Sequence, residues 1–477
     1  MPEPERVNLA IALVSLAQCA LRVKGYAAPR VDSGEFGSFG ENTVAAVDKL
    51  RDDANYHDRA IDGSGRDRNG AHMIDREVWK GLCSQDAYVM LPGGDANIRT
   101  IQRRLNGNYQ PGVGLSPADG VVTPQLSRAL IRAVQMVVGV TADGLWGDAT
   151  TSSIPAMIND QSDPQGIWAD LLAYGLYLNS FIADVSAPTW GSISEPLHSF
   201  ANFMRLNSGG THRANRAMIS ALFVSHGDRS RGYNSLIPVY GVPAVGIDLA
   251  TKLNDRTGTF SNSSAGLSRL HIGFVGRYMQ NAPQPIHDKE LTPEEVEELL
   301  ALNGSDEGGP YRFGIAPIWQ TSANYPEYFT PQQGTTDAGL AKARGDYLGM
   351  PNDVTVYFAV DYDAFGSDID NRIVPYFRAL NAENTRIGGR PIGAYGPRAV
   401  CNRLYEEALA TASYVGNLSY GWTGNLGQPM PQNWAIDQFV EFDAQLFTND
   451  GQRAELVGVD QLVYSGQHGK LWQRPEF

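Results

Sequence analysis

The sequence contains few cysteines and no long apolar run. Three cysteines, Cys19, Cys83 and Cys401, are scattered through 477 residues without the C-x-x-C spacing of a zinc site or the density of a disulfide framework. We expect buried free thiols, because cysteine is among the most frequently buried residue types. No run of about 18 apolar residues occurs, so the sequence predicts no transmembrane segment.

Positive charge is also scarce. Lys and Arg number 38 against 52 Asp and Glu, which gives a net charge of -14, and the pI is about 5.0. No Lys/Arg-rich segment offsets this charge locally, and a molecule of this kind repels phosphate backbones. Nucleic acid is therefore not an expected partner.

The N-terminal region lacks the charge pattern of a signal peptide. Its apolar stretch follows Glu3 and Glu5 rather than a positive segment. Four of its apolar residues recur at helical spacing: Leu9, Leu13, Leu16 and Ala20. This pattern predicts an amphipathic helix that belongs to a folded domain.

The composition is otherwise that of a globular protein. Hydrophobic residues make up 42% of the chain and aromatic residues 10%, which is enough for about two to four domains with cores of their own. The first half carries two copies of the pattern G-x-aromatic-G-acid-x-T, at 37–43 and 144–150. Because the glycines permit tight turns and the acid suits a helix N-terminus, the pattern predicts small units of helices joined by turns.

We expect three such helical units: residues 1–90, residues 91–162, and a diverged repeat or linker domain at 163–235. The order of their elements, with D-G-x-x-G-x-x-T at 143–150, resembles the peptidoglycan-binding repeat of many cell-wall hydrolases. The resemblance implies binding to wall glycan or stem peptide. Plain helical spacers remain the alternative, since Asp-Gly turns before helices are common.

Residues 242–477 have a different pattern, in which short apolar runs alternate with amphipathic ones. Such alternation predicts a parallel sheet with helical connections, and about eight strands in about 230 residues is the size of a (β/α)8 TIM-type barrel. The chain is thus expected to be multidomain, with small all-α repeats followed by an α/β barrel. Eight strand candidates lie within 242–250, 268–279, 313–322, 354–363, 390–397, 412–422, 433–440 and 454–464.

The fourth strand candidate, VTVYFAVDYD, ends in Asp361 and Asp363. Alternation along the strand predicts both carboxylates on the inner face, at the C-terminal end where barrel enzymes carry their active sites. Other strand candidates end in residues of similar chemistry, which we expect at the same mouth. These residues are Asp248, Gln320, Tyr395, Asp437 and Gln438.

The 242–477 region resembles the glycoside-hydrolase-like barrels related to family 25 lysozymes, particularly their actinobacterial and phage-associated group. The motifs that carry the resemblance are GIDLA at Gly246, GRYM at Gly276, which includes Tyr278, APIWQ at Ala316, VYFAVDYDA at Val356, GAYGP at Gly393 and NWAIDQF at Asn433. The resemblance implies a barrel fold and a glycosidase site. The lysozyme relatives carry Asp-x-Glu on the fourth strand, whereas here Asp363 stands at the place of the glutamate.

A glycosidase needs one protonated and one ionised carboxyl group, and two carboxylates that repel on one strand face supply this asymmetry. We therefore predict Asp363 as the acid/base and Asp361 as the nucleophile or electrostatic stabiliser, with Asp248 as a third catalytic carboxylate. The expected substrate-binding residues are Tyr278, Gln320, Tyr395, Asp437 and Gln438. A salt-bridged barrel rim is the alternative interpretation of the aspartates.

No cofactor and no metal is expected. An EF-hand loop that starts at Asp361 would place Phe365 and Arg372 at ligand positions, so the calcium motif fails. Nucleophilic catalysis by Cys401 would need a histidine at the mouth, so we interpret this cysteine as a core residue. His271 is likewise interpreted as a core histidine.

The sequence therefore predicts a cell-wall-directed glycoside hydrolase, muramidase-like, that acts on peptidoglycan or a related wall polysaccharide. The alternative is a non-catalytic protein that binds wall glycan. Because no signal peptide is evident, we expect delivery to the cell wall or the cell exterior by a phage particle, a secretion machinery or lysis.

Overall fold

The computed structural model describes residues 3–57, 73–207, 210, 212–226, 242–250, 252, 272–281, 288–306, 309–419, 421–447 and 453–474. His271 lies outside these ranges. The chain divides into two compact units. The first comprises Met1–Trp146, Gln165–Tyr177 and Ile182–Thr189, and the second comprises Gly147–Pro164, Leu178–Phe181 and Trp190–Phe477.

The first unit is built from helices. They are α1 (Glu3–Val23), α2 (Glu41–Ala54), α3 (Arg76–Cys83), α4 (Ala96–Asn108), α5 (Gln110–Val113), α6 (Pro124–Val138) and nearly all of α8 (Ile167–Leu178). Side chains of α1, α2 and α3 form one hydrophobic core, which includes Leu21, Leu50 and Val78. The predicted helical character of this region is thus confirmed.

The apolar face expected for α1 is largely exposed. Leu9, Leu13 and Leu16 remain 46%, 43% and 52% exposed, whereas Ala17 and Leu21 are buried. The helix forms as predicted, but the face assignment is wrong, because from Leu9 onward the buried side chains of α1 lie in its last two turns.

One turn arrangement occurs three times in this unit. Each time, a buried glutamine on a helix accepts a hydrogen bond at Oε1 from the N–H of a turn glycine and donates from Nε2 to another group of the same turn. The pairs are Gln18 with Gly37 (2.8 Å), Gln102 with Gly120 (2.8 Å) and Gln135 with Gly144 (2.9 Å). All three glycines have positive φ, which favours glycine at these turns. Both copies of the sequence pattern, at 37–43 and 144–150, thus begin at a glycine that is held by a buried glutamine.

The second unit begins with a helical part. It contains α7 (Asp148–Ser153), α9 (Trp190–Phe203), α10 (Arg216–Phe223) and the antiparallel pair β1 (Met157–Asn159) and β2 (Arg213–Asn215). The division between the units therefore crosses the predicted segments 91–162 and 163–235.

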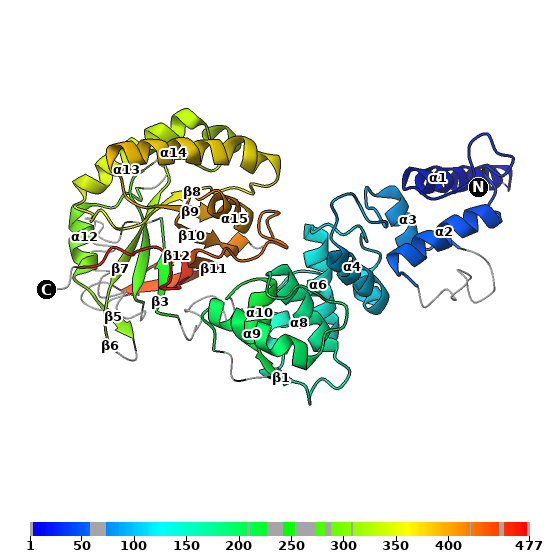
Figure 1. Ribbon diagram of the computed structural model, residues 1–477, viewed down its shortest axis with the longest axis horizontal. Coiled ribbons are helices and arrows are strands. Elements are labelled where there is room, and N and C mark those ends of the chain that lie inside the picture. The colour runs from blue at the N-terminus through cyan, green and yellow to red at the C-terminus, as the bar shows by residue number, and fades with distance from the viewer. Residues whose placement is uncertain are drawn as a thin grey trace. The chain divides into compact units, whose positions relative to one another are not determined.

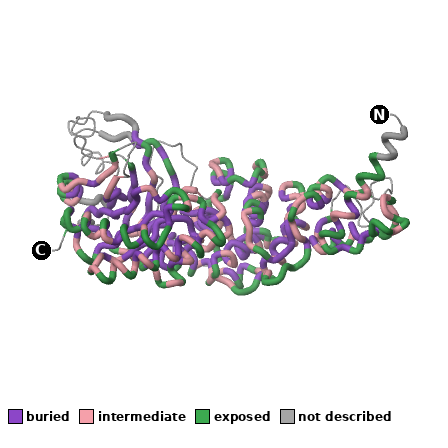
Figure 2. Tube along the Cα trace, turned by 90° about the horizontal axis from the view of Figure 1, so that it is seen from above, coloured by how far each residue is buried: buried purple, intermediate pink, exposed green. Residues whose placement is uncertain are grey.

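The rest of the second unit is a closed eight-stranded barrel (Figure 1). All eight predicted strand candidates form barrel strands. They are β3 (Ala244–Asp248), β4 (Phe274–Tyr278), β7 (Gly314–Trp319), β8 (Val356–Ala359), β9 (Ile392–Gly396), β10 (Ala412–Gly416), β11 (Trp434–Phe447) and β12 (Arg453–Tyr464). Every residue of β4, β7, β8 and β9 is buried, as expected for strands covered on both faces. Figure 2 shows the buried stretches of the chain inside the exposed ones.

The last strand departs from a regular (β/α)8 arrangement. Seven strands run parallel, but β12 is antiparallel to both of its neighbours, β11 and β3. The sheet closes in the order β10-β11-β12-β3-β4-β7-β8-β9. A strand that follows β11 without an intervening helix can only return antiparallel, and this return sets which residue faces Asp248.

Helices connect the parallel strands. They are α12 (Pro293–Leu300), α13 (Pro331–Tyr347), α14 (Val374–Ile387) and α15 (Arg398–Glu406), while β5 (Asn303–Asp306) and β6 (Gly309–Arg312) form a separate hairpin. Thr292 caps α12 by accepting from the N–H of Glu295. Within the described ranges, no helix has the length and apolar character that crossing a membrane requires.

Candidate active site at the barrel mouth

Polar side chains gather where the parallel barrel strands end. Inside the barrel below them, the buried rings of Tyr357 and Tyr414 pack edge to face with centroids 5.6 Å apart. The groups at the mouth are Asp248, Tyr278, Lys289, Gln320, Asp361, Tyr395, Tyr414, Gln438 and Asp460.

Asp248 and Asp460 form a carboxyl pair. They are direct partners in the antiparallel register of β3 and β12, so their side chains lie on the same face of the sheet. The two carboxyl groups are close enough for each to affect the pKa of the other. Gln438 holds them from a third strand, because its Nε2 donates to Asp248 Oδ2 at 3.0 Å and to Asp460 Oδ2 at 2.7 Å.

Two tyrosines fix the orientation of this pair. Tyr414 donates its hydroxyl hydrogen to Asp248 Oδ2, and Tyr395 donates to Oε1 of Gln438 at 3.1 Å. Tyr414 reaches Asp248 across Gly276, where a Cβ atom would lie 2.6 Å from the Asp248 Cβ and 3.1 Å from the Tyr414 hydroxyl. Only glycine at this position leaves the space that the contact needs.

The surroundings of the pair favour a retained proton. Burial raises the pKa of Asp248, although hydrogen bonds from Tyr414 and Gln438 oppose the shift. Burial raises the pKa of Asp460 as well, and the charge of Asp248 adds to this effect. Because two ionised carboxylates held together by one Gln438 amide would repel, one of them holds a proton near neutral pH.

The opposite side of the mouth carries an exposed carboxylate and a cation. Asp361 follows the end of β8, is exposed, and accepts from Nε2 of Gln320 at 2.9 Å. Lys289 donates to Oε1 of the same Gln320 at 2.7 Å, and its Nζ lies 3.8 Å from the centroid of the Tyr278 ring. Burial lowers the pKa of Lys289 to about 8. The mouth thus combines the proton of the Asp248–Asp460 pair with the exposed carboxylate of Asp361 and the ammonium group of Lys289.

Asp363 does not join this group. It is exposed, and its two carboxylate oxygens accept backbone hydrogen bonds from the N–H groups of Thr423 and Gly424, both at 3.0 Å. The prediction that strand alternation would aim it at the barrel axis is wrong for a simple reason. Strand β8 ends at Ala359, so alternation no longer applies at residue 363.

Asp437 also lies elsewhere. Its buried carboxylate accepts from the Ser225 hydroxyl, contacts Nδ1 of His226, and accepts from Nδ2 of Asn417 at 2.6 Å. Burial opposes ionisation, but the hydrogen bond and charge of His226 outweigh it and hold the pKa of Asp437 below its usual value. Since Gln438 faces the barrel interior, its neighbour Asp437 must face outward, and the expectation that both line the mouth is corrected.

Six of the eight predicted site residues therefore meet at the mouth, and three mouth residues were not predicted. Asp460 belongs to a strand whose direction the sequence pattern did not specify. Tyr414 lies within a predicted strand, where alternation could have identified it. Lys289 lies in a loop without a recognisable pattern.

The cysteines follow the prediction only in part. Cys401 in α15 is fully buried, and burial raises the pKa of its thiol to about 12. Cys19 is half-buried and Cys83 is exposed, so the expectation of burial is wrong for these two. Across the described chain, no three His, Cys, Asp or Glu side chains gather as metal ligands.

Comparison with known proteins identifies two domain types. Residues 266–469 match the family model of the Rv2525c-like, glycoside hydrolase-like domain. Most of the barrel is thus similar to a glycoside hydrolase-like domain. Residues 91–213 match the model of the FadG/YbfG, PGDB-like domain.

Two relatives come from Bacillus subtilis (strain 168). The uncharacterized protein FadG is 29% identical over 461 residues, which cover 95% of this chain and 72% of FadG. The uncharacterized protein YbfG is 32% identical over 403 residues, which cover 82% of this chain and 50% of YbfG. The chain thus spans about half the length of YbfG.

Solved structures with related features include two named proteins. The Mycobacterium tuberculosis Tat-secreted protein Rv2525c, in complex with HEPES, has 16% identity and a TM-score of 0.36, covering 48% of this chain and 98% of that chain. The modular autolysin LytC of Streptococcus pneumoniae, in complex with a synthetic peptidoglycan ligand, has 14% identity and a TM-score of 0.28, covering 46% of each chain.

Proposed function

We propose that this protein is a cell-wall-directed glycoside hydrolase that cleaves peptidoglycan or a related wall polysaccharide, with muramidase-like chemistry. The glycoside hydrolase-like and peptidoglycan-binding-like domain types point to a function connected with cell-wall glycan. The observation that carries the catalytic part is the Asp248–Asp460 pair, in which Asp248 is buried and Asp460 half-buried, because glycoside hydrolysis requires a carboxyl group that keeps its proton.

In the proposed reaction, the pair donates its proton to the glycosidic oxygen as the bond to the sugar carbon breaks. Asp361 attacks that carbon or stabilises the positive charge that develops on it. Water then supplies a hydroxyl group to the sugar and returns a proton to the pair. Because both oxygens of Asp363 already accept backbone hydrogen bonds, we assign the acid role to the pair.

We further propose that the protein acts at the cell wall or outside the cell, with the helical region as its anchor. The peptidoglycan-binding-like match at residues 91–213 supports this division of labour. The barrel then cleaves the polymer to which the helical region holds it.

Digestion of purified cell walls by the full-length chain tests the proposal. We expect new reducing ends from the wild-type protein and their loss in Asp248→Asn. A wild-type protein that sediments with the walls but releases no reducing ends would contradict the proposal and favour a non-catalytic glycan-binding protein.

A further inference from the structure

A partly open pocket with polar and apolar lining, called the chamber below, lies beside the barrel mouth. Its volume is about 620 Å³, within the range of small-molecule sites in proteins. Its walls come from the segments that follow β4 and β7 and from helix α13. They include Gln280, Asn281, Thr321, Gln333, Leu340 and Arg344.

The chamber shares its walls with the mouth. Glu290 and Thr321 line the chamber, and they directly follow Lys289 and Gln320, which are hydrogen-bonded to each other at the mouth. In each of the two segments, one residue lies at the mouth and the next residue lines the chamber. The mouth and the chamber therefore adjoin at these two segments.

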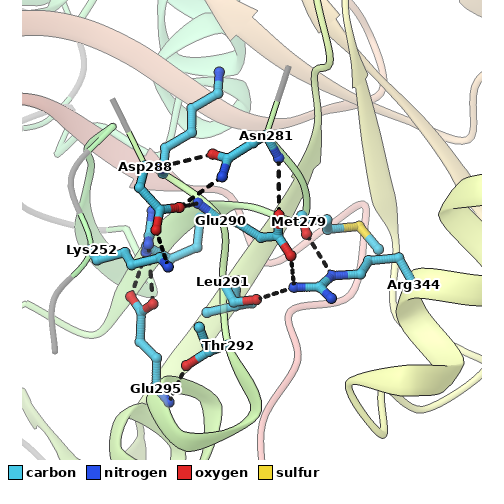
Figure 3. A network of polar contacts seen from close by, with 11 residues as sticks. Lys252, Met279, Asn281, Asp288, Glu290, Leu291, Thr292, Glu295 and Arg344 are labelled. Carbon is cyan, nitrogen blue, oxygen red and sulfur yellow. Dashed lines mark hydrogen bonds and ion pairs between the residues drawn. The ribbon is translucent and has the colours of Figure 1, made fainter. Parts of the chain in front are cut away.

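The chamber walls are held rigidly on the side of Arg344. The guanidinium of Arg344 donates from Nε to the carbonyl of Met279 at 2.9 Å and from Nη2 to the carbonyl of Leu291 at 2.7 Å (Figure 3). It also pairs with Glu290 at 2.5 Å. Asn281 holds the same loop, because its Nδ2 donates to Asp288 at 2.7 Å. These contacts orient the wall before any ligand arrives.

Two turns earlier on α13, the chamber wall is fixed around a buried carboxylate. Asp337 is fully buried and accepts from the hydroxyls of Tyr328 (2.7 Å) and Tyr376 (2.6 Å) and from Nε2 of Gln333 (3.0 Å). The Gln333 side chain is therefore locked with its Oε1 available. Its orientation does not depend on a ligand.

Donors and acceptors remain available in the chamber. Within the described part of the chain, the Gln280 amide, Oε1 of Gln333 and Nη1 of Arg344 have no hydrogen-bond partner. The positive charge of Arg344 is already matched by Glu290, and Asp337 adds a negative charge, so an anionic ligand is disfavoured. Leu340, which is 44% exposed, adds an apolar surface. This combination suits a neutral ligand with hydroxyl and amide groups.

We propose that the chamber is a subsite for an N-acetylated hexosamine unit of the glycan whose neighbouring unit occupies the mouth. The hydroxyl and amide groups of such a sugar match the available donors and acceptors, and its acetyl methyl group matches Leu340. This assignment rests on the proposed function, because it takes the polymer at the mouth to be wall glycan.

Calorimetric binding of β-1,4-linked N-acetylglucosamine oligomers tests the subsite, using the full-length chain with Asp460→Asn so that no cleavage interferes. We expect the pentasaccharide to bind more tightly than the disaccharide. Gln280→Ala should weaken pentasaccharide binding about three- to tenfold, which is the worth of one hydrogen bond. Disaccharide binding should not change.

Leu340→Trp, which narrows the chamber, should have the same selective effect. Gln332→Ala is the matched control, because Gln332 is an exposed glutamine of the same helix that does not line the chamber. Melting temperatures establish that the variants are folded.

Equal pentasaccharide affinity in Gln280→Ala, Leu340→Trp and Gln332→Ala would overturn the subsite. Equal or tighter binding of the deacetylated pentasaccharide would overturn the assignment to an N-acetylated sugar. The proposed function fails separately, if the wild-type protein releases no reducing ends while the chamber variants still lose pentasaccharide affinity.

Discussion

Two pairs of aspartates in the barrel differ in how they are built. Asp361 and Asp363 are two residues apart, exposed, and engaged by Gln320 and by two backbone N–H groups respectively. Asp248 and Asp460 come from the first and last strands of the barrel, yet they are partners in register and are joined by the Gln438 amide, with Asp248 buried. The comparison teaches that closeness in sequence does not make a proton-holding pair. Two carboxyl groups hold a proton between them when they lie close together and are shielded from water.

The largest effect on the rate of wall hydrolysis is expected when a carboxyl group of the Asp248–Asp460 pair is replaced by an amide. Asp248→Asn and Asp460→Asn should lower the rate of wall hydrolysis by about 10²- to 10⁴-fold, because each removes the proton-holding pair. Asp363→Asn should lower it far less, since an amide oxygen still accepts one of the two backbone hydrogen bonds. Reducing-end assays on folded variants measure both effects. A loss in Asp363→Asn as great as in Asp460→Asn would reverse the comparison.

A second prediction concerns the outward-facing aspartate of β11. Asp437→Ala should lower the free energy of unfolding by about 3–5 kcal/mol, because it leaves His226 buried without its charged partner. Asp443→Ala, at an exposed aspartate of the same strand, is the control and should change stability little. Urea denaturation measures the difference. Equal stability of the two variants would show that the Asp437–His226 contact does not contribute to the free energy of unfolding.

The smallest expected effect is on the pH dependence of stability. The pKa values of Asp248 and Asp460 are raised above the ordinary value of 3.8, so the folded protein binds more protons than the unfolded chain above that pH. Stability should therefore fall as pH rises from about 4 through neutrality. Asp460→Asn should reduce this slope in denaturation curves recorded across the range. An unchanged slope would mean that the pair holds no extra proton.

Much of the barrel could be predicted because its signals are local. Each strand candidate is a short apolar run bounded by turn residues, and a run such as VTVYFAVDYD needs no distant partner to be recognised. The ends of parallel strands meet at one edge of the sheet, so Asp248, Gln320, Asp361, Tyr395 and Gln438 could be assigned to one mouth. The prediction from side-chain alternation was wrong for Asp363, because strand β8 ends four residues before it, at Ala359.

The sequence by itself determined the order of helices and strands, the turn glycines of the helical region and most of the polar groups at the mouth, since neighbouring residues encode all of these. Only the tertiary structure decided that β12 returns antiparallel beside β3, which brings Asp460 against Asp248. The tertiary structure also decided that the Asp363 carboxylate accepts a hydrogen bond from the N–H of Thr423 in a distant loop. The physical reason is that the pairing of distant strands and the burial of a charge depend on closure of the whole barrel, which no local pattern specifies.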